Sequence, residues 1–171
     1  MIPDCARAFG RNEKVILRNP SSVRPWQHVL EPLRFYLLVA EKAHRRENVS
    51  PAYNVGPRPE EVATVEDVMN WFTQYWPHAP GWQSADIKNS PHESLRLILK
   101  TDLAEKSLRW QPQIPLQKGI ELTACWYQMY YQGKDHIELL NYTKKQIYDW
   151  GLQKTRENQQ SLDFQNREAQ L

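Results

Sequence analysis

The chain has 171 residues, which is enough for one domain with a real core and too few for two ordinary ones. With 40% hydrophobic and 25% charged residues, its composition is that of a globular protein rather than a disordered one. It contains no run of roughly 18 apolar residues, which excludes a membrane span. A formal charge of +2 lacks the large basic excess of a nucleic-acid-binding module. Residues 1–7 lack the apolar core of a signal peptide, so we expect a cytoplasmic protein.

Glycine, cysteine and histidine limit the chemistry that the chain can carry. Its six glycines are scattered, whereas a dinucleotide- or phosphate-binding loop needs clustered ones. Cys5 and Cys125 form neither a metal-like spacing nor a disulfide framework, so we interpret them as small core residues in a reducing compartment. His78, His92 and His136 are too far apart in the sequence to suggest a metal site. We therefore expect no metal centre.

In the first half of the chain, the pattern predicts two helices and two short strands. A helix is expected over 3–9, ending at Gly10, and a strand over 14–18. A second helix should begin near 29–31, because Pro32 fits only a first turn and Leu33, Leu37 and Ala40 follow with helical spacing. Residues 52–57 are expected to form a short strand that leads into a turn.

The second half begins with the clearest helix of the sequence. Thr64 can cap it, with Asp67 completing a capping box, and Pro77 ends it. Its expected buried face consists of Val65, Val68, Met69, Phe72 and Trp76. We expect a loop, a strand and three further helices after it, at 78–90, 95–99, 101–108, 115–132 and 138–150. Residues 1–152 then form the folded part and 153–171 a polar tail, frayed or disordered.

Arg24 is the strongest candidate for binding chemistry. Its guanidinium is a rigid fork of donors that matches phosphate oxygens, and Trp26 and His28 place flat rings beside it. The alternative is an ordinary arginine in a surface salt bridge.

Tyr130 and Lys134 fit the Tyr-x-x-x-Lys spacing of short-chain dehydrogenases. Gly133 interrupts the pair at an expected helix end, so we interpret the match as chance.

A long run of sequence carries a specific resemblance. Ile16–Pro20 followed by Arg24–Pro32, Arg-Pro-Trp-Gln-His-Val-Leu-Glu-Pro, resembles the CDP-glucose 4,6-dehydratases. These enzymes form a branch of the extended short-chain dehydrogenase/reductase family of nucleotide-sugar epimerases and dehydratases. The resemblance covers about residues 2–152. Its less specific pieces are Ile2-Pro3-Asp4, Tyr53–Pro57, Pro91-His92-Glu93, Leu99–Pro112 and Gln146-Ile147-Tyr148.

The resemblance implies an enzyme of two parts. In that family, an N-terminal half of the Rossmann type holds NAD and supplies the catalytic Tyr and Lys, while a smaller C-terminal half binds the diphosphate of the nucleotide sugar. This chain resembles the C-terminal, substrate-binding half alone. We therefore expect a mixed α/β fold, mainly helices with a few short strands and no Rossmann half. We also expect no NAD and no catalytic residue in this chain.

The resemblance also assigns roles to individual residues. Arg24 matches the arginine that binds the substrate diphosphate, and Asn54 an asparagine near it. Val15, Ile16 and Leu17 match a run that passes the nucleotide base through backbone groups. His92 lies where many relatives carry an arginine for the same phosphates. Trp26, Gln27 and His28 are characteristic of the branch; either they support Arg24 or they simply pack in the core around it.

The expected ligand is CDP-glucose, which the whole enzyme would convert to CDP-4-keto-6-deoxyglucose; alone, this chain should show no turnover. The chain could be a gene remnant, or half of a split enzyme. Its expected protein partner is a separate Rossmann chain or a second copy of this chain in a homo-oligomer. The alternative from another class is a non-enzymatic interaction module, in which the aromatic helices over 65–76 and 120–131 dock a partner. Nucleic acid and membranes are not expected partners.

Overall fold

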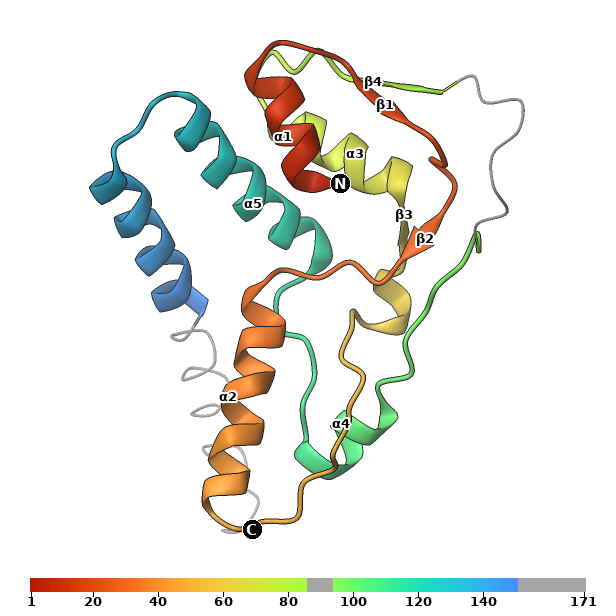
Figure 1. The fold of residues 1–171 in the computed structure, drawn as a ribbon, viewed down its shortest axis with the longest axis vertical. Coiled ribbons are helices and arrows are strands. Elements are labelled where there is room, and N and C mark those ends of the chain that lie inside the picture. Colours follow the sequence, from red (N-terminus) through yellow and green to blue (C-terminus); the bar gives the residue numbers. More distant parts are fainter. Residues whose placement is uncertain (86–93, 151–171) are drawn as a thin grey trace, which may run out of the picture. The chain divides into compact units, whose positions relative to one another are not determined.

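The structure is a computed structural model of the chain, and it describes residues 1–85 and 94–150 (Figure 1). The chain divides into two units, Met1–Gln132 and Gly133–Leu171, which are described separately below. The predicted tail over 153–171 lies outside the described residues. None of the helices in the described part is both long enough and apolar enough to cross a membrane.

The first unit is a mixed α/β structure in which helices dominate and the strands are short, as the sequence predicts (Figure 1). Its elements are α1 (Ile2–Gly10), β1 (Val15–Leu17), β2 (Val23–Arg24), α2 (Leu30–His44), the 3₁₀ turn η1 (Pro59–Glu61), β3 (Ala63–Thr64), α3 (Val65–Gln74), β4 (Trp82–Ser84), α4 (Asp102–Leu108) and α5 (Leu116–Tyr131).

Helix α3 begins where the sequence predicts. The Thr64 hydroxyl accepts the backbone N–H of Asp67 at 3.0 Å, and the Asp67 carboxylate accepts the N–H of Thr64 at 2.9 Å. Together the two bonds satisfy donors that a helix start leaves unpaired. The buried side chains of α3 are Val68, Met69 and Phe72, on the face that the apolar spacing predicts.

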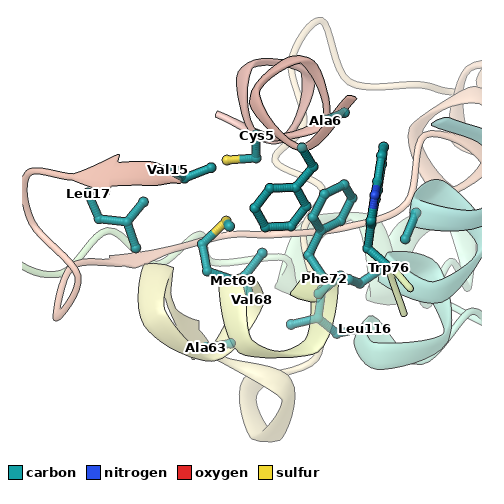
Figure 2. Packing of buried hydrophobic residues seen from close by; sticks show 13 residues of the cluster. Cys5, Ala6, Val15, Leu17, Ala63, Val68, Met69, Phe72, Trp76 and Leu116 are labelled. Carbon is teal, nitrogen blue, oxygen red and sulfur yellow. The ribbon is translucent and has the colours of Figure 1, made fainter. Parts of the chain in front are cut away.

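Two apolar cores hold the first unit together. The larger one joins α1, β1, α3 and α5, whose side chains point into one common space (Figure 2). At its centre the Phe9 ring lies 5.8 Å from the Phe72 ring and 5.6 Å from the Trp76 ring, centroid to centroid. The smaller core joins α2 and α4, where Phe35 meets Trp110 edge to face at 5.6 Å. Such aromatic pairs add to the stabilisation that apolar burial supplies.

The strands pair over long sequence distances. β1 and β4 are parallel, with Val15 opposite Trp82, and β2 and β3 are antiparallel, with Arg24 opposite Ala63. Three sequence predictions are wrong here. Residues 52–57 and 95–99 were expected as strands, but the first forms no strand and the second only an isolated bridge from Arg96 to Val23. The expected loop over 78–90 contains β4 instead.

In the second unit, residues 136–150 form a helix that begins two residues before the predicted one. The Asp135 carboxylate accepts the backbone N–H of Glu138 at 2.8 Å, and Lys134 pairs with Glu138 at 2.9 Å. Helix α5 ends at Tyr131, and Gly133 follows with a φ of +77°. Tyr130 and Lys134 therefore do not share a continuous helix.

Candidate functional site

Arg24 lies at the rim of a hollow in the first unit. Strand β2 fixes its backbone through the pairing with β3, and its side chain is half-buried. Nη1 donates to the backbone carbonyls of Val23 at 2.8 Å and Ser94 at 3.1 Å. The hollow is small and partly open, with room of about 30 Å³ for water-sized groups. Its described lining residues are Arg24, Pro25, Pro57, Pro59, Val62, Leu97, Ile98 and Leu99.

The chemistry of the hollow combines one cation with apolar walls. Among the described lining residues, Arg24 alone carries a charge, and the others are proline and aliphatic side chains. Binding pockets commonly pair such apolar walls with a few polar groups that orient the ligand, and they span about 300–1,000 Å³. With room of about 30 Å³, the described hollow is far smaller than such a pocket: it can take a group of a few atoms against Arg24, and it does not enclose a nucleotide sugar.

Asn54 lies on a segment that passes this hollow. A Cβ atom added at Gly56 would lie 3.6 Å from Leu99 and 3.9 Å from Pro25, so the backbone here runs close to two lining residues. The Gln27 amide donates to the Val55 carbonyl in a long hydrogen bond of 3.5 Å. Asn54 itself is exposed and is not among the described lining residues.

Val15, Ile16 and Leu17 are not brought to the hollow by the described structure. On β1, Val15 and Leu17 point into the larger core, and Ile16 is 62% exposed. The Val15 N–H donates to the Gly81 carbonyl at 3.1 Å, and the Leu17 carbonyl accepts from Ala85 at 2.8 Å. These backbone groups are therefore engaged in the β1–β4 ladder and its extension. His92 lies outside the described residues.

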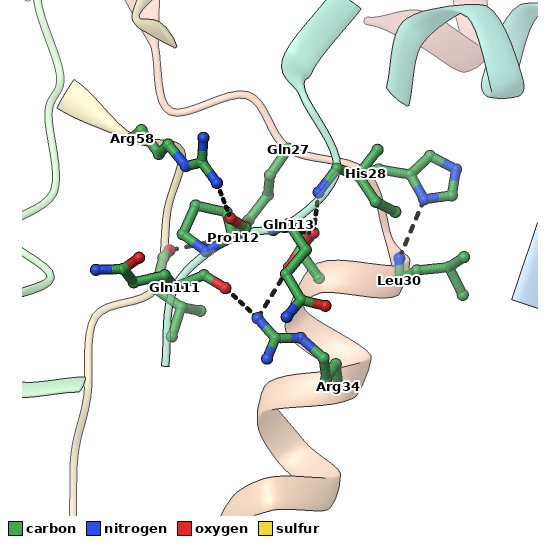
Figure 3. A network of polar contacts seen from close by, with 11 residues as sticks. Gln27, His28, Leu30, Arg34, Arg58, Gln111, Pro112 and Gln113 are labelled. Carbon is green, nitrogen blue, oxygen red and sulfur yellow. Dashed lines mark hydrogen bonds and ion pairs between the residues drawn. The ribbon is translucent and has the colours of Figure 1, made fainter. Parts of the chain in front are cut away.

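His28 lies between the start of α2 and α5 and contacts both (Figure 3). Its Nδ1 accepts the backbone N–H of Leu30 at 3.3 Å, at the start of α2. On the other side it packs on Gly119, where an added Cβ would lie only 3.0 Å from the His28 Cβ. Burial lowers the pKa of the imidazole, which favours the neutral form that this hydrogen bond requires. Trp26 packs against the larger core.

Glu31 is a buried anchor that the sequence analysis missed. Its side chain is fully buried, and Oε1 accepts the backbone N–H groups of Gln113 at 2.7 Å and Ile114 at 2.6 Å (Figure 3). Arg34 lies 3.5 Å from Oε2 and also donates to the Gln111 carbonyl. Glu31 shares a helix face with buried Phe35, four residues later. That pattern, an acid in line with an apolar face, is the signal that could have identified it.

Arg34 completes this anchor. Its guanidinium lies 5.5 Å from the centroid of the Trp110 ring, a cation–π distance. Burial lowers the pKa of Arg34, and the neighbouring Glu31 carboxylate opposes that shift. Glu31 and Arg34 thus join the start of α2 to residues 110–114. Within 1–85 and 94–150, no group of three His, Cys, Asp or Glu side chains could hold a metal ion.

No protein-family model matches the chain. Over 151 residues it is 36% identical to CDP-glucose 4,6-dehydratase of Salmonella typhimurium. The match covers 88% of this chain and 41% of that protein, so the chain spans about two fifths of the length of this relative.

Solved structures show the same fold. UDP-glucose 4-epimerase of Thermotoga maritima, solved with UDP-glucose, superposes with a TM-score of 0.58 at 20% identity, over 75% of this chain and 39% of the epimerase. The enzyme of Stenotrophomonas maltophila, solved with NAD and formylated UDP-arabinopyranose, gives 0.63 at 14% identity, over 77% and 40%. The chain is thus a relative of CDP-glucose 4,6-dehydratase in sequence, with the fold of the C-terminal part of the short-chain dehydrogenase/reductase epimerases.

Proposed function

We propose that this chain is the substrate-binding part of a CDP-glucose 4,6-dehydratase and that Arg24 binds the diphosphate of CDP-glucose. The observation that carries the proposal is the position of Arg24, a cation at the rim of an otherwise apolar hollow. It lies within the matching run Arg24–Pro32, and the chain is 36% identical to a CDP-glucose 4,6-dehydratase.

The physical argument concerns the guanidinium. Arginine makes charge-assisted hydrogen bonds to phosphate that are about twice as strong as neutral ones. The bonds from Nη1 to the carbonyls of Val23 and Ser94 hold the side chain in one orientation, so little rotamer freedom is left to lose when a ligand binds. We assign Asn54 and His92 to the surroundings of the same diphosphate, on the resemblance alone.

NAD does not fit the residues of this chain. The glycines, at positions 10, 56, 81, 119, 133 and 151, form no glycine-rich loop of the kind that holds a pyrophosphate. We therefore propose that residues outside this chain hold NAD and carry out the oxidation and water elimination. This chain binds the nucleotide sugar and orients it for those residues.

A second candidate function rests on an exposed apolar stripe along α2. Val29, Leu33, Tyr36 and Leu37 are 60%, 47%, 62% and 73% exposed and share one helix face. Apolar patches of this kind commonly mark surfaces that bind another protein. A complex with another protein that forms equally with and without CDP, and that Leu37→Glu abolishes, would favour this candidate.

Calorimetric titration of the full chain with CDP-glucose tests the first proposal. We expect saturable binding, and a loss of affinity of at least about tenfold in Arg24→Ala, the scale of one hydrogen bond to a charged group. Arg45→Ala is the matched control, because Arg45 is exposed and pairs with Glu41. The melting temperature of each variant shows whether Arg24→Ala still folds. Equal affinity of Arg24→Ala and the wild type, or no binding by the wild type, would contradict the proposal.

A further inference from the structure

Besides Arg24, the lining of the hollow includes Pro57 and Pro59. These prolines belong to the stretch 52–58 and the turn η1, which lie outside any strand. The stretch must be held in place by other contacts if the wall is to keep its distance from Arg24. A main-chain ladder begins only after it, where Ala63 pairs with Arg24 itself, in the part of the chain that the structure describes.

Arg58 supplies one such contact. It directly precedes the turn η1, with φ of −62° and ψ of 150°. Its Nη2 donates to the Pro112 carbonyl at 3.0 Å (Figure 3). Arg58 is not among the described lining residues of the hollow. Its side chain is exposed, and it bonds a neighbouring segment rather than any residue that lines the hollow.

The Pro112 carbonyl is itself fixed from two sides. The N–H groups of Gln113 and Ile114, which follow it, donate to the buried Glu31 carboxylate, and the Gln111 carbonyl, which precedes it, accepts from Arg34. Pro112 is buried between them. A buried carboxylate with two short hydrogen bonds is a rigid attachment point, because breaking either bond leaves a charge partly unsatisfied.

Two parts of the hollow's lining are thus connected to one stretch of chain, 24–34. Arg24 belongs to it directly, and Pro57 and Pro59 are connected to it through Arg58, Pro112 and Glu31. We propose that Arg58 is a positioning residue that holds this wall against Arg24 and so sets the affinity for a nucleoside diphosphate without touching it. The inference rests on the proposed function, since it concerns the same site.

The test is titration of the full chain with CDP in the variants Arg58→Ala, Arg58→Lys, Arg24→Ala and the double variant. Arg58→Ala should weaken CDP binding about tenfold, the scale of one charged hydrogen bond. Arg58→Lys should restore part of the loss, because an ammonium can still reach a carbonyl. Because Arg58 acts through the wall that faces Arg24, the double variant should bind little more weakly than Arg24→Ala alone. Arg109→Ala, at an exposed arginine that follows α4, is the matched control.

Hydrogen exchange provides a readout that needs no ligand. Arg58→Ala should speed exchange of the Gly56 and Glu61 amides and leave those of α3 unchanged. Unchanged exchange and CDP affinity in Arg58→Ala would overturn the inference while the proposed function stands. So would additive losses in the double variant together with a lower salt dependence of binding in Arg58→Ala, which would make Arg58 a direct phosphate contact. A wild-type chain that binds no CDP would overturn both.

Discussion

His28 combines a buried ring with a hydrogen bond that only a neutral imidazole can accept. Burial lowers its pKa in the folded chain, whereas the unfolded chain keeps the ordinary value near 6.5. Acidification therefore protonates the unfolded state first. The contribution of His28 to stability is complete above about pH 6.5 and is lost as the pH falls through the folded-state pKa.

We predict that the urea midpoint of the wild type falls between pH 7 and pH 5 more steeply than that of His28→Asn, whose side-chain oxygen can still accept the Leu30 N–H. His44→Asn, at an exposed histidine, should keep the wild-type profile. Parallel profiles for the wild type and His28→Asn would show that this imidazole is not responsible.

The two cysteines should differ sharply in reactivity. Cys5 is 1% exposed, and burial raises its pKa to about 11, so very little reactive thiolate is present near neutral pH. Cys125 is half-buried on α5. We predict that a thiol reagent at pH 8 modifies Cys125 rapidly in the native chain, and both cysteines after unfolding. Cys125→Ser should then show almost no native reaction; rapid labelling of that variant would disprove the prediction.

At the scale of residues, sequence reasoning could identify Arg24 but not its surroundings. Arg24 stands in one continuous, recognisable run, and its chemistry can be read from its type. Apart from Pro25, the other described lining residues come from 57–62 and 97–99, which only the folded chain brings to it. Arg58 was missed because its partner is the backbone carbonyl of Pro112, a pairing that leaves no mark in the residue types. For Glu31, the sequence carries a sign of burial, its place in line with Phe35, but not the backbone groups of 113–114 that it bonds.

At the scale of elements, the capping box of α3 is the feature best suited to a stability measurement. Thr64→Ala removes the hydroxyl that accepts the Asp67 N–H, and we expect a loss of about 1 kcal/mol in the free energy of unfolding. Thr64→Ser keeps the hydroxyl and should lose much less. Denaturant titration of both variants measures the difference, and equal losses would mean that the methyl group, not the cap, carries the effect.

The helices and strands differ in how much local sequence specifies them. α1, α3 and α5 were predicted within a few residues, because caps, prolines and a repeating apolar face all act within one stretch of chain. β2 and β3 have two residues each and pair with each other across some forty positions of sequence. No periodicity can show in so short a strand. Residues 52–57 have the residue types of a strand but no partner ladder, so they remain irregular.

At the scale of the whole molecule, ligand binding should affect the two units differently. The candidate site lies entirely within Met1–Gln132. A ligand that binds the folded state alone stabilises it by about 2.7 kcal/mol at a hundred times its Kd. In a chain of this size, each kcal/mol raises the melting temperature by about 2–4 °C, so CDP-glucose should raise it by about 5–10 °C.

Tryptophan fluorescence can isolate that transition, because every tryptophan except Trp150 lies in the first unit. We predict that CDP-glucose shifts the fluorescence melting curve of the wild type and leaves that of Arg24→Ala in place, while Arg45→Ala shifts like the wild type. The physical reason is linkage: a variant that has lost the phosphate contact has lost the free energy that binding adds to the folded state. An equal shift in Arg24→Ala would show that CDP-glucose binds the first unit without help from the Arg24 guanidinium, at another site.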